Sequence, residues 1–227
     1  MKPSRIAFTA AVALIASGAQ AALINHTVTA TSGAQSTALW DTGSGLEWLS
    51  PVTTRNRTIS QVLGGYGGWV QSGYRYASTA EFQLLLAHAG LPGATSGVTS
   101  WNAPPALYAL HQLVMDLGWT YEWQAPSPGD PLGRYGVWGI FSDLYPGDGH
   151  TPSSRLYGSL ISGSSAGGVS WSGQWLFDGQ DNLVGSFLVR ERASVPEPGV
   201  LGLALCSLGI MVWSARQRRT STPRREA

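Results

Sequence analysis

The chain has 227 residues, of which 43% are hydrophobic and only 12% charged, and it contains 29 glycines and ten tryptophans. This composition excludes intrinsic disorder and indicates a loop-rich domain with large aromatic side chains. The net charge of +1 hides an asymmetry, because residues 22–194 carry 11 acidic residues against seven arginines, while residues 216–227 carry five arginines against one acidic residue. An acidic body lacks the basic patch that nucleic-acid binding needs, so no nucleic-acid partner is expected.

The first 21 residues have the three parts of a secretory signal peptide. Lys2 and Arg5 precede an apolar stretch, and Ala19 and Ala21 form a small-x-small cleavage site. We therefore expect the Sec translocon to export the chain and residues 1–21 to be removed. A buried N-terminal helix is the alternative.

Short strands are predicted after this segment. Residues 27–29, 38–40 and 46–49 are rich in β-branched and large apolar side chains. The sequence DTGSG at residues 41–45 is typical of a hairpin turn between the second and third of these strands.

Two helices are predicted next. Ser78 and Glu81 form a capping box, and Gly90 follows as a natural stop. The apolar face between them repeats at helical spacing and consists of Phe82, Leu85, Leu86 and Ala89. A second helix is predicted from Pro105 to Leu117, closed by Gly118, with a core stripe of Leu107, Leu110, Val114 and Leu117.

The later part of the body predicts strands separated by turns. Large apolar residues alternate with small or polar ones in TYEW, YGVWGIF, RLYGSLI, SWSGQWLF and NLVGSFLVRE, the last of which covers residues 182–191. Helices early and strands later indicate an α+β fold for residues 22–194.

Three stretches of this body resemble a known family. DTGSGLEWL, YRYASTAEFQLLL and VGSFLVRE are similar to the opening motif, the helix start and the closing strand of the Lcl C-terminal domain family, over residues 39–191. The middle stretch departs from the family, because its Trp, Leu and Pro are all replaced. The resemblance implies a C-type-lectin-like fold with two helices, twisted antiparallel strands and long loops. It also implies that the first and last strands pair, which would bring GLEWL near GSFLVRE.

The sequence favours a body that is not an enzyme and needs no cofactor. It has no Gly-x-Ser-x-Gly elbow in a strand–turn–helix context and no thiol, since the single Cys206 lies in the C-terminal apolar run. A secreted polysaccharide-modifying enzyme is the alternative. It would need paired carboxylates, for which the candidates are Glu81 with Asp116 and Asp143 with Asp148.

No metal site is predicted, with one weak exception. Asp178, Asp181 and Asn182 are a candidate Ca²⁺ site, because their oxygens can converge, but the spacing departs from the EF-hand and a turn is the simpler interpretation. The histidines show no His-x-x-x-His pair.

Tryptophans are the remaining candidates for ligand contacts. Trp119 and Trp123, with Tyr121 between them, lie beside a proline-rich loop and are the candidates for stacking on sugar rings. Six other tryptophans are predicted to pack in the core: Trp40, Trp48, Trp69, Trp138, Trp171 and Trp175.

The C-terminal segment has three parts in a fixed order. The motif Val195, Pro196, Glu197 and Pro198 precedes an uncharged apolar run at residues 199–213. An arginine cluster then includes Arg216, Arg218 and Arg219. The prolines favour an extended chain before the run, and the arginines favour a cytoplasmic end. The run predicts a transmembrane helix, although 15 residues span only about 22 Å.

This order resembles the PEP-CTERM sorting signal, over residues 195–219. The resemblance implies an exosortase as partner, which processes the chain near the Pro-Glu-Pro motif, and leaves residues 220–227 as a cytoplasmic tail. A permanent anchor with incidental prolines is the alternative. Together the segments predict a protein anchored in the inner membrane with a periplasmic body, then released to the envelope or matrix. There it would serve adhesion, matrix structure or binding of exopolysaccharide.

Overall fold

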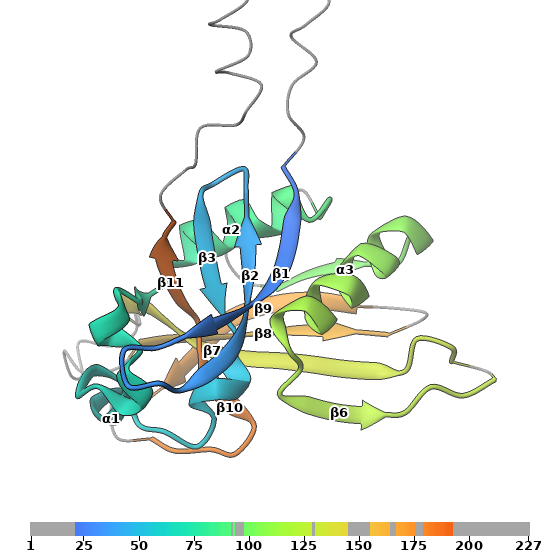
Figure 1. The fold of residues 1–227 in the computed structure, drawn as a ribbon. Helices are drawn as coiled ribbons and strands as arrows, with labels where there is room; N and C mark the ends of the chain where they lie inside the picture. Colours follow the sequence, from blue (N-terminus) through green and yellow to red (C-terminus); the bar gives the residue numbers. More distant parts are fainter. Residues whose placement is uncertain are drawn as a thin grey trace, which may run out of the picture. The chain divides into compact units, whose positions relative to one another are not determined.

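The computed structural model describes residues 21–91, 93, 98–128, 130–144, 155–163, 167–175 and 179–192. They form an α+β fold with two mostly antiparallel sheets and few helices, which confirms the predicted class. Both sheets and the described helices belong to one unit that ends at Glu191 (Figure 1).

A five-stranded sheet contains the two ends of this unit. Its strand order is β1 (Leu23–Thr29), β2 (Gln35–Asp41), β3 (Leu46–Leu49), β11 (Leu188–Glu191) and β4 (Arg75–Tyr76), with antiparallel neighbours throughout. Val189 pairs with Trp48, so the predicted proximity of GLEWL and GSFLVRE is confirmed. The early strand beside β11 is β3, whereas the first strand β1 pairs with β2.

A six-stranded sheet contains the later strands. Its order is β10 (Val184–Ser186), β7 (Arg134–Leu144), β8 (Arg155–Ser162), β9 (Gly167–Trp175) and β5 (Val98–Trp101), with β6 (Tyr121–Gln124) paired to β7. β10 runs parallel to β7, and the other pairs are antiparallel. The prediction of one strand over residues 182–191 is wrong, because the chain passes between the sheets at Phe187. There the Phe187 amide donates to Ile140 at 3.0 Å, and its carbonyl accepts from Ala77 at 2.8 Å.

Two helices lie where the sequence predicts them. α2 (Thr79–His88) starts with the capping box of Ser78 and Glu81, and Gly90 adopts a left-handed φ of 80° behind it. α3 (Pro104–Leu117) ends at Gly118 with φ 85°. The predicted number of two is wrong, because a third helix, α1 (Ile59–Leu63), is present, together with the short 3₁₀ segments η1 (Pro51–Thr54), η2 (Tyr66–Gly68) and η3 (Val70–Ser72).

Apolar side chains fill both faces of the five-stranded sheet, because alternate residues of a strand point to opposite faces. Leu39, Trp48 and Val189 join the core cluster that includes α2, α3 and the six-stranded sheet. Their neighbours Leu49 and Leu188 join a second cluster with α1. The last strand therefore contributes to both cores.

The chain enters and leaves the unit at one end of the five-stranded sheet. Leu23 pairs with Asp41, Asp41 with Leu46, and Leu46 with Glu191, so the start of β1 and the end of β11 share one row (Figure 1). The β1–β2 turn lies at the other end of the sheet. The two ends of β2 are six residues apart, which corresponds to a distance of about 20 Å along the strand.

A buried carboxylate connects β11 to the rest of the sheet. Glu47, with a side chain 1% exposed, accepts hydrogen bonds from Tyr74 Oη at 2.5 Å and Arg190 Nε at 2.6 Å, and lies 2.7 Å from His26 Nε2. Burial alone would raise the pKa of Glu47, but these hydrogen bonds outweigh it and hold the pKa below its ordinary value. Glu47 is therefore charged in the folded protein at neutral pH.

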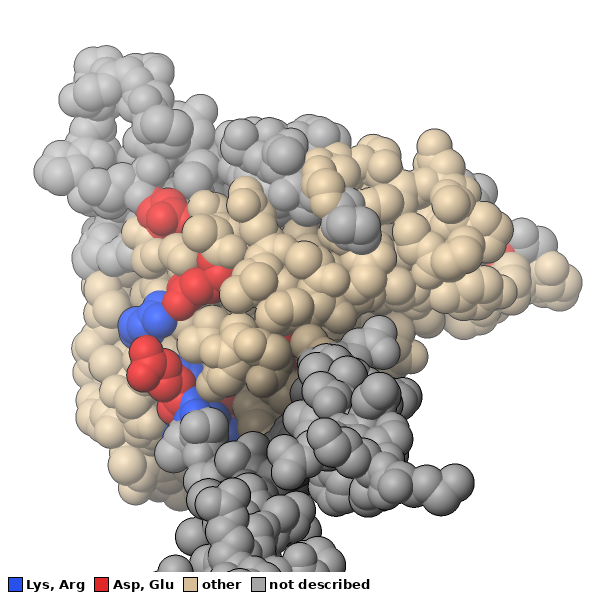
Figure 2. Space-filling model, turned by 90° about the horizontal axis from the view of Figure 1, so that it is seen from above, with Lys and Arg blue, Asp and Glu red and all other residues tan. Residues whose placement is uncertain are grey.

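Charged side chains gather in one band on the end from which the chain emerges. In the view from above, acidic and basic residues lie next to one another along this band, and most of the remaining described surface is uncharged (Figure 2). Arg75 donates to Glu81 at 2.6 Å, and the pKa of Arg75 is raised by this hydrogen bond and by Glu191. Opposite charges thus largely compensate one another.

Candidate functional site

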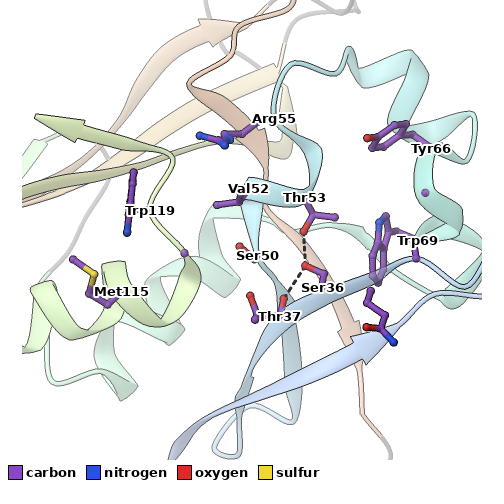
Figure 3. Close-up of a pocket in the computed structure, with 14 residues that line it drawn as sticks. Ser36, Thr37, Ser50, Val52, Thr53, Arg55, Tyr66, Trp69, Met115 and Trp119 are labelled. Carbon is purple, nitrogen blue, oxygen red and sulfur yellow. Dashed lines mark hydrogen bonds between the residues drawn. The ribbon is translucent and has the colours of Figure 1, made fainter.

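An open hollow of about 720 Å³ lies where β2 begins and where β3 and α3 end. It is far from the end at which the chain enters and leaves, because Gln35 begins β2 and Asp41 ends it. Figure 3 shows the hollow with its lining residues.

The middle of the hollow is lined by hydroxyl groups. Ser36 and Thr37 come from β2, and Ser50 and Thr53 come from the segment after β3. Ser36 forms a short hydrogen bond to Thr53 Oγ1, and the Ser50 amide donates to the Thr37 carbonyl at 3.0 Å. These contacts hold β2 against η1 and fix the hydroxyls of Ser36 and Thr53, so the floor of the hollow is polar.

Aromatic rings stand on two sides of this floor (Figure 3). Trp119, after α3, is 39% exposed, and Tyr66, in η2, is 37% exposed. Trp119 packs against Tyr135 at 5.6 Å between ring centroids, which fixes its orientation. Trp69 lies beneath, 1% exposed, with an edge contact to Tyr74. An exposed aromatic ring beside hydroxyls can stack on the apolar face of a polar ring ligand.

Two glycines allow the chain to come close enough to form the hollow. Gly67 has a left-handed φ of 67°, and a Cβ there would lie 2.5 Å from Trp69 Nε1. Gly118, with φ 85°, would place a Cβ against Ser50 Oγ. Side chains at either position would displace the wall.

Arg55 lines the hollow, and Arg57 contacts the lining residue Tyr66. Arg55 Nη1 donates to the Thr120 carbonyl at 3.1 Å, and the guanidinium of Arg57 lies 4.3 Å from the centroid of the Tyr66 ring. None of the described residues that line the hollow is acidic. The site can therefore contact apolar ring faces, hydroxyls and negative charge, but it offers no carboxylate for acid–base chemistry.

The structure separates the predicted stacking residues. Trp119 lines the hollow and contacts Tyr135, whereas Tyr121 contacts Trp123 at 5.4 Å and Trp138 at 5.9 Å. Tyr135 and Trp138 are three residues apart on β7 and so point to opposite faces. Trp123 is 56% exposed, but it lies on the other face of the sheet from Trp119.

The structure describes the side chains of four of the six tryptophans that are predicted to lie in the core. Trp48 and Trp69 are fully buried, as predicted. Trp40 and Trp138 are half-buried. The side chains of Trp171 and Trp175 lie outside the described part.

The candidate carboxylate pairs are occupied by other partners. Glu81 accepts from Arg75 and from the Ser78 amide, as its capping role requires. Asp116 accepts from Asn25 Nδ2 at 2.6 Å and from Gln112 Nε2 at 2.8 Å. No contact between Glu81 and Asp116 occurs in the described structure.

The second carboxylate pair and the Ca²⁺ candidate are only partly described. Asp143 accepts from the Thr79 amide at 2.5 Å, and Asp148 lies outside the described residues. Asp181 Oδ1 accepts from the Leu183 amide at 2.7 Å, which is the contact of a turn. Asn182 follows it, and Asp178 is not described. Within the described ranges, no three metal-ligating side chains lie together.

The targeting segments fall almost entirely outside the described structure. Ala21 is the first described residue, and Ala19 precedes it. The motif at residues 195–198 and the cluster of Arg216, Arg218 and Arg219 also lie outside. Of the helices in the described part, none has both the length and the apolar content to cross a bilayer.

Sequence reasoning found Trp119 but missed the rest of the hollow. Ser36, Thr53, Arg55 and Tyr66 come from separate elements, and no local pattern marks them as a group. The one available signal was the glycine-rich stretch around Tyr66, GGYGG, which is typical of a chain that approaches other backbone closely.

Comparison with known proteins gives no further guide. The chain matches no model of a protein family, no curated protein and no solved structure.

Proposed function

We propose that this chain is an exported, non-enzymatic protein of the cell envelope that binds exopolysaccharide in the hollow between Trp119 and Tyr66. The observation that carries the proposal is the combination of a fixed hydroxyl floor with two half-exposed aromatic rings. Sugar rings present the complementary surface, because their C–H faces are apolar and their edges carry hydroxyls. Such a site also suits an adhesive or matrix role.

The placement of the chain ends supports this proposal. Both ends of the body lie at one end of the five-stranded sheet, and the hollow lies about 20 Å away at the other. In the proposed anchored form, three residues separate Glu191 from Val195. The chain would continue to the anchor from one end of the body, and the hollow lies at the opposite end of the sheet.

The fold agrees with the lectin-like part of the proposal. A C-type-lectin-like domain brings its last strand back beside an early one, and β11 pairs with β3 here. Helices α2 and α3 follow the early strands, as the resemblance to the Lcl C-terminal domain family implies. We propose a lectin-like relationship on this basis, with a variant strand order.

Catalysis on the polysaccharide is the competing proposal, and the lining residues favour binding. Hydrolysis of a glycosidic bond generally needs two carboxylates on either side of that bond. None of the described residues that line the hollow is acidic, and Glu81 and Asp116 are held by other partners. These contacts support the proposal of binding without turnover.

The experiment compares two tryptophans of one chain. The full chain, purified in mild detergent, is titrated with extracellular polysaccharide from the cells that make it. Trp119→Ala should weaken binding by about tenfold or more, because truncating a central aromatic contact typically costs that much. Trp123→Ala, on the opposite sheet face, is the matched control and should bind within about twofold of the wild type. Equal binding by both variants, or release of reducing ends, would overturn the proposal.

Sorting through the tail requires a separate test. Mass spectrometry of the mature protein should find a C-terminus near residues 195–198, and replacement of Pro196, Glu197 and Pro198 by alanine should leave the tail attached. An intact Arg-rich end on the wild-type protein in its final location would exclude processing by an exosortase.

A further inference from the structure

The charge around the hollow differs from the charge elsewhere on the body. Three arginines outside the hollow pair with carboxylates: Arg75 with Glu81 at 2.6 Å, Arg190 with Glu47 at 2.6 Å, and Arg134 with Asp130 at 3.6 Å.

Arg55, which lines the hollow, and Arg57, which contacts the lining residue Tyr66, have no such partner. In the described part of the chain, no carboxylate lies within 4.0 Å of Arg55 or Arg57. The hollow therefore has an uncompensated positive charge on a body whose residues 22–194 are acidic overall.

Arg55 is held in a fixed position that leaves donors for a ligand. Its Nη1 donates to the Thr120 carbonyl at 3.1 Å, and its Nε and Nη2 have no hydrogen bond within the described structure. A guanidinium matches the planar geometry of a carboxylate and can donate two parallel hydrogen bonds to it. Figure 3 shows the Arg55 side chain extending on the same side of the floor as Trp119.

Arg57 adds positive charge through a second aromatic wall. Its guanidinium lies over the face of Tyr66, which lines the hollow, although Arg57 is not itself a lining residue. This cation–π contact keeps the charge close to the site, since the ring attracts the cation. Positive charge thus accompanies both aromatic walls, while the floor between them is neutral.

We propose that the ligand of the hollow is an acidic polysaccharide, in which a carboxylated sugar places its ring on Trp119 and its carboxylate on Arg55. This inference rests on the proposed function and specifies its substrate class. A planar carboxylate fits the available donors of Arg55, and the neighbouring hydroxyls of Ser36 and Thr53 suit the sugar hydroxyls. Positive charge at the site also attracts an anionic polymer from a distance, in a manner that salt weakens.

The test changes the charge of the polymer while it keeps the backbone. Extracellular polysaccharide from the cells that make the protein is used in its native form and after chemical reduction of its carboxylates to alcohols. The full chain in detergent should bind the reduced polymer at least about tenfold more weakly than the native one, because charged hydrogen bonds are lost. Raising the salt concentration should weaken binding of the native polymer alone.

Variants of Arg55 show whether the discrimination comes from this residue. Arg55→Gln should lower affinity for the native polymer about tenfold, leave affinity for the reduced polymer unchanged, and reduce the salt dependence. Arg55→Lys should recover part of the loss. Arg134→Gln, which removes a charge outside the hollow, should behave as the wild type. A loss of binding to both polymers by Arg55→Gln would indicate a merely structural role and overturn the assignment.

The outcomes separate this inference from the proposed function. Equal binding of native and reduced polymer overturns the acidic ligand and leaves polysaccharide binding intact. Absence of binding to both forms by the wild-type chain overturns both. Discrimination that persists in Arg55→Gln would assign the carboxylate to another residue and overturn the role of Arg55.

Discussion

Removal of the Arg190 side chain by Arg190→Met should destabilise the body by about 3 kcal/mol at neutral pH. Breaking a buried ion pair typically costs about 3–5 kcal/mol, because it leaves a buried charge uncompensated. Glu47 is 1% exposed, but Arg190 is 29% exposed, so water already screens part of the pair and the lower end applies. Tyr74 and His26 would remain as hydrogen-bond partners of the carboxylate.

The pH dependence distinguishes charge from packing. In the wild type the pKa of Glu47 is lowered, so the stability from its ionised form is present above the ordinary value of 4.5 and is lost as the pH falls through the folded value. Without Arg190, the pKa of Glu47 should rise, because one hydrogen bond and one attractive charge that lower it are removed. The stability difference between wild type and variant should therefore shrink as the pH falls toward the pKa of Glu47 in the folded wild type.

Urea unfolding of the full chain in mild detergent, followed by tryptophan fluorescence, measures both effects. The double variant Glu47→Gln/Arg190→Met is the control, because removing both charges should recover much of the loss. A difference that stays constant with pH would refute the reasoning. It would mean that Arg190 contributes through its packing on Tyr74, whose ring centroid lies 4.6 Å from the guanidinium carbon.

Four further substitutions test three other features. Gly118→Ala should destabilise by about 1–3 kcal/mol through its left-handed φ and the clash with Ser50, and it should weaken polysaccharide binding. Gly33→Ala is the control, because Gly33 has a φ of 87° but open space around it, and it should lower the unfolding free energy in urea by less than Gly118→Ala does. An equal loss for both variants would contradict a clash between residue 118 and Ser50. Ser78→Ala should cost about 1 kcal/mol in unfolding free energy by loss of the N-cap, and no loss in thermal unfolding would refute the capping role. Burial lowers the pKa of His111, so the unfolding free energy should fall as the pH drops below 6.5. His111→Gln should make the unfolding free energy less dependent on pH, as measured by urea titrations at several pH values.

Local signals were sufficient for the two longer helices. The boundaries of α2 follow from Ser78, Glu81 and Gly90, which act within a few residues of one another. Helix α1 has a capping box of the same kind, with Thr58 and Gln61. It escaped prediction because five residues are too short to display an apolar period.

The division of the last strand could not be predicted in this way. Residues 182–191 alternate as one strand would, yet Val184 pairs in the six-stranded sheet and Leu188 in the five-stranded sheet. The break at Phe187 depends on contacts with Ile140 and Ala77, which are distant in the chain. Long-range partners, not local pattern, decide where such a strand ends.

The same limit applies to the hollow. The composition around Trp119 indicated an exposed ring, and the structure agrees. The floor needs Ser36 and Thr53, which are brought together by the return of the chain after β3. Their closeness in the sequence also led us to group Trp119 with Trp123. Sequence spacing does not reveal that Tyr135, which contacts Trp119, and Trp138, on the side of Trp123, point to opposite faces of the sheet.

The position of β11 connects the fold to the proposed processing of the tail. β11 lies between β3 and β4, contributes to both cores and is held by the Glu47–Arg190 pair. A cut near residues 195–198 would fall beyond this strand and remove none of the described core. The body can then keep the same fold and the same hollow whether it is anchored or released. Processing would change where the protein is located, while the proposed binding site stays unaltered.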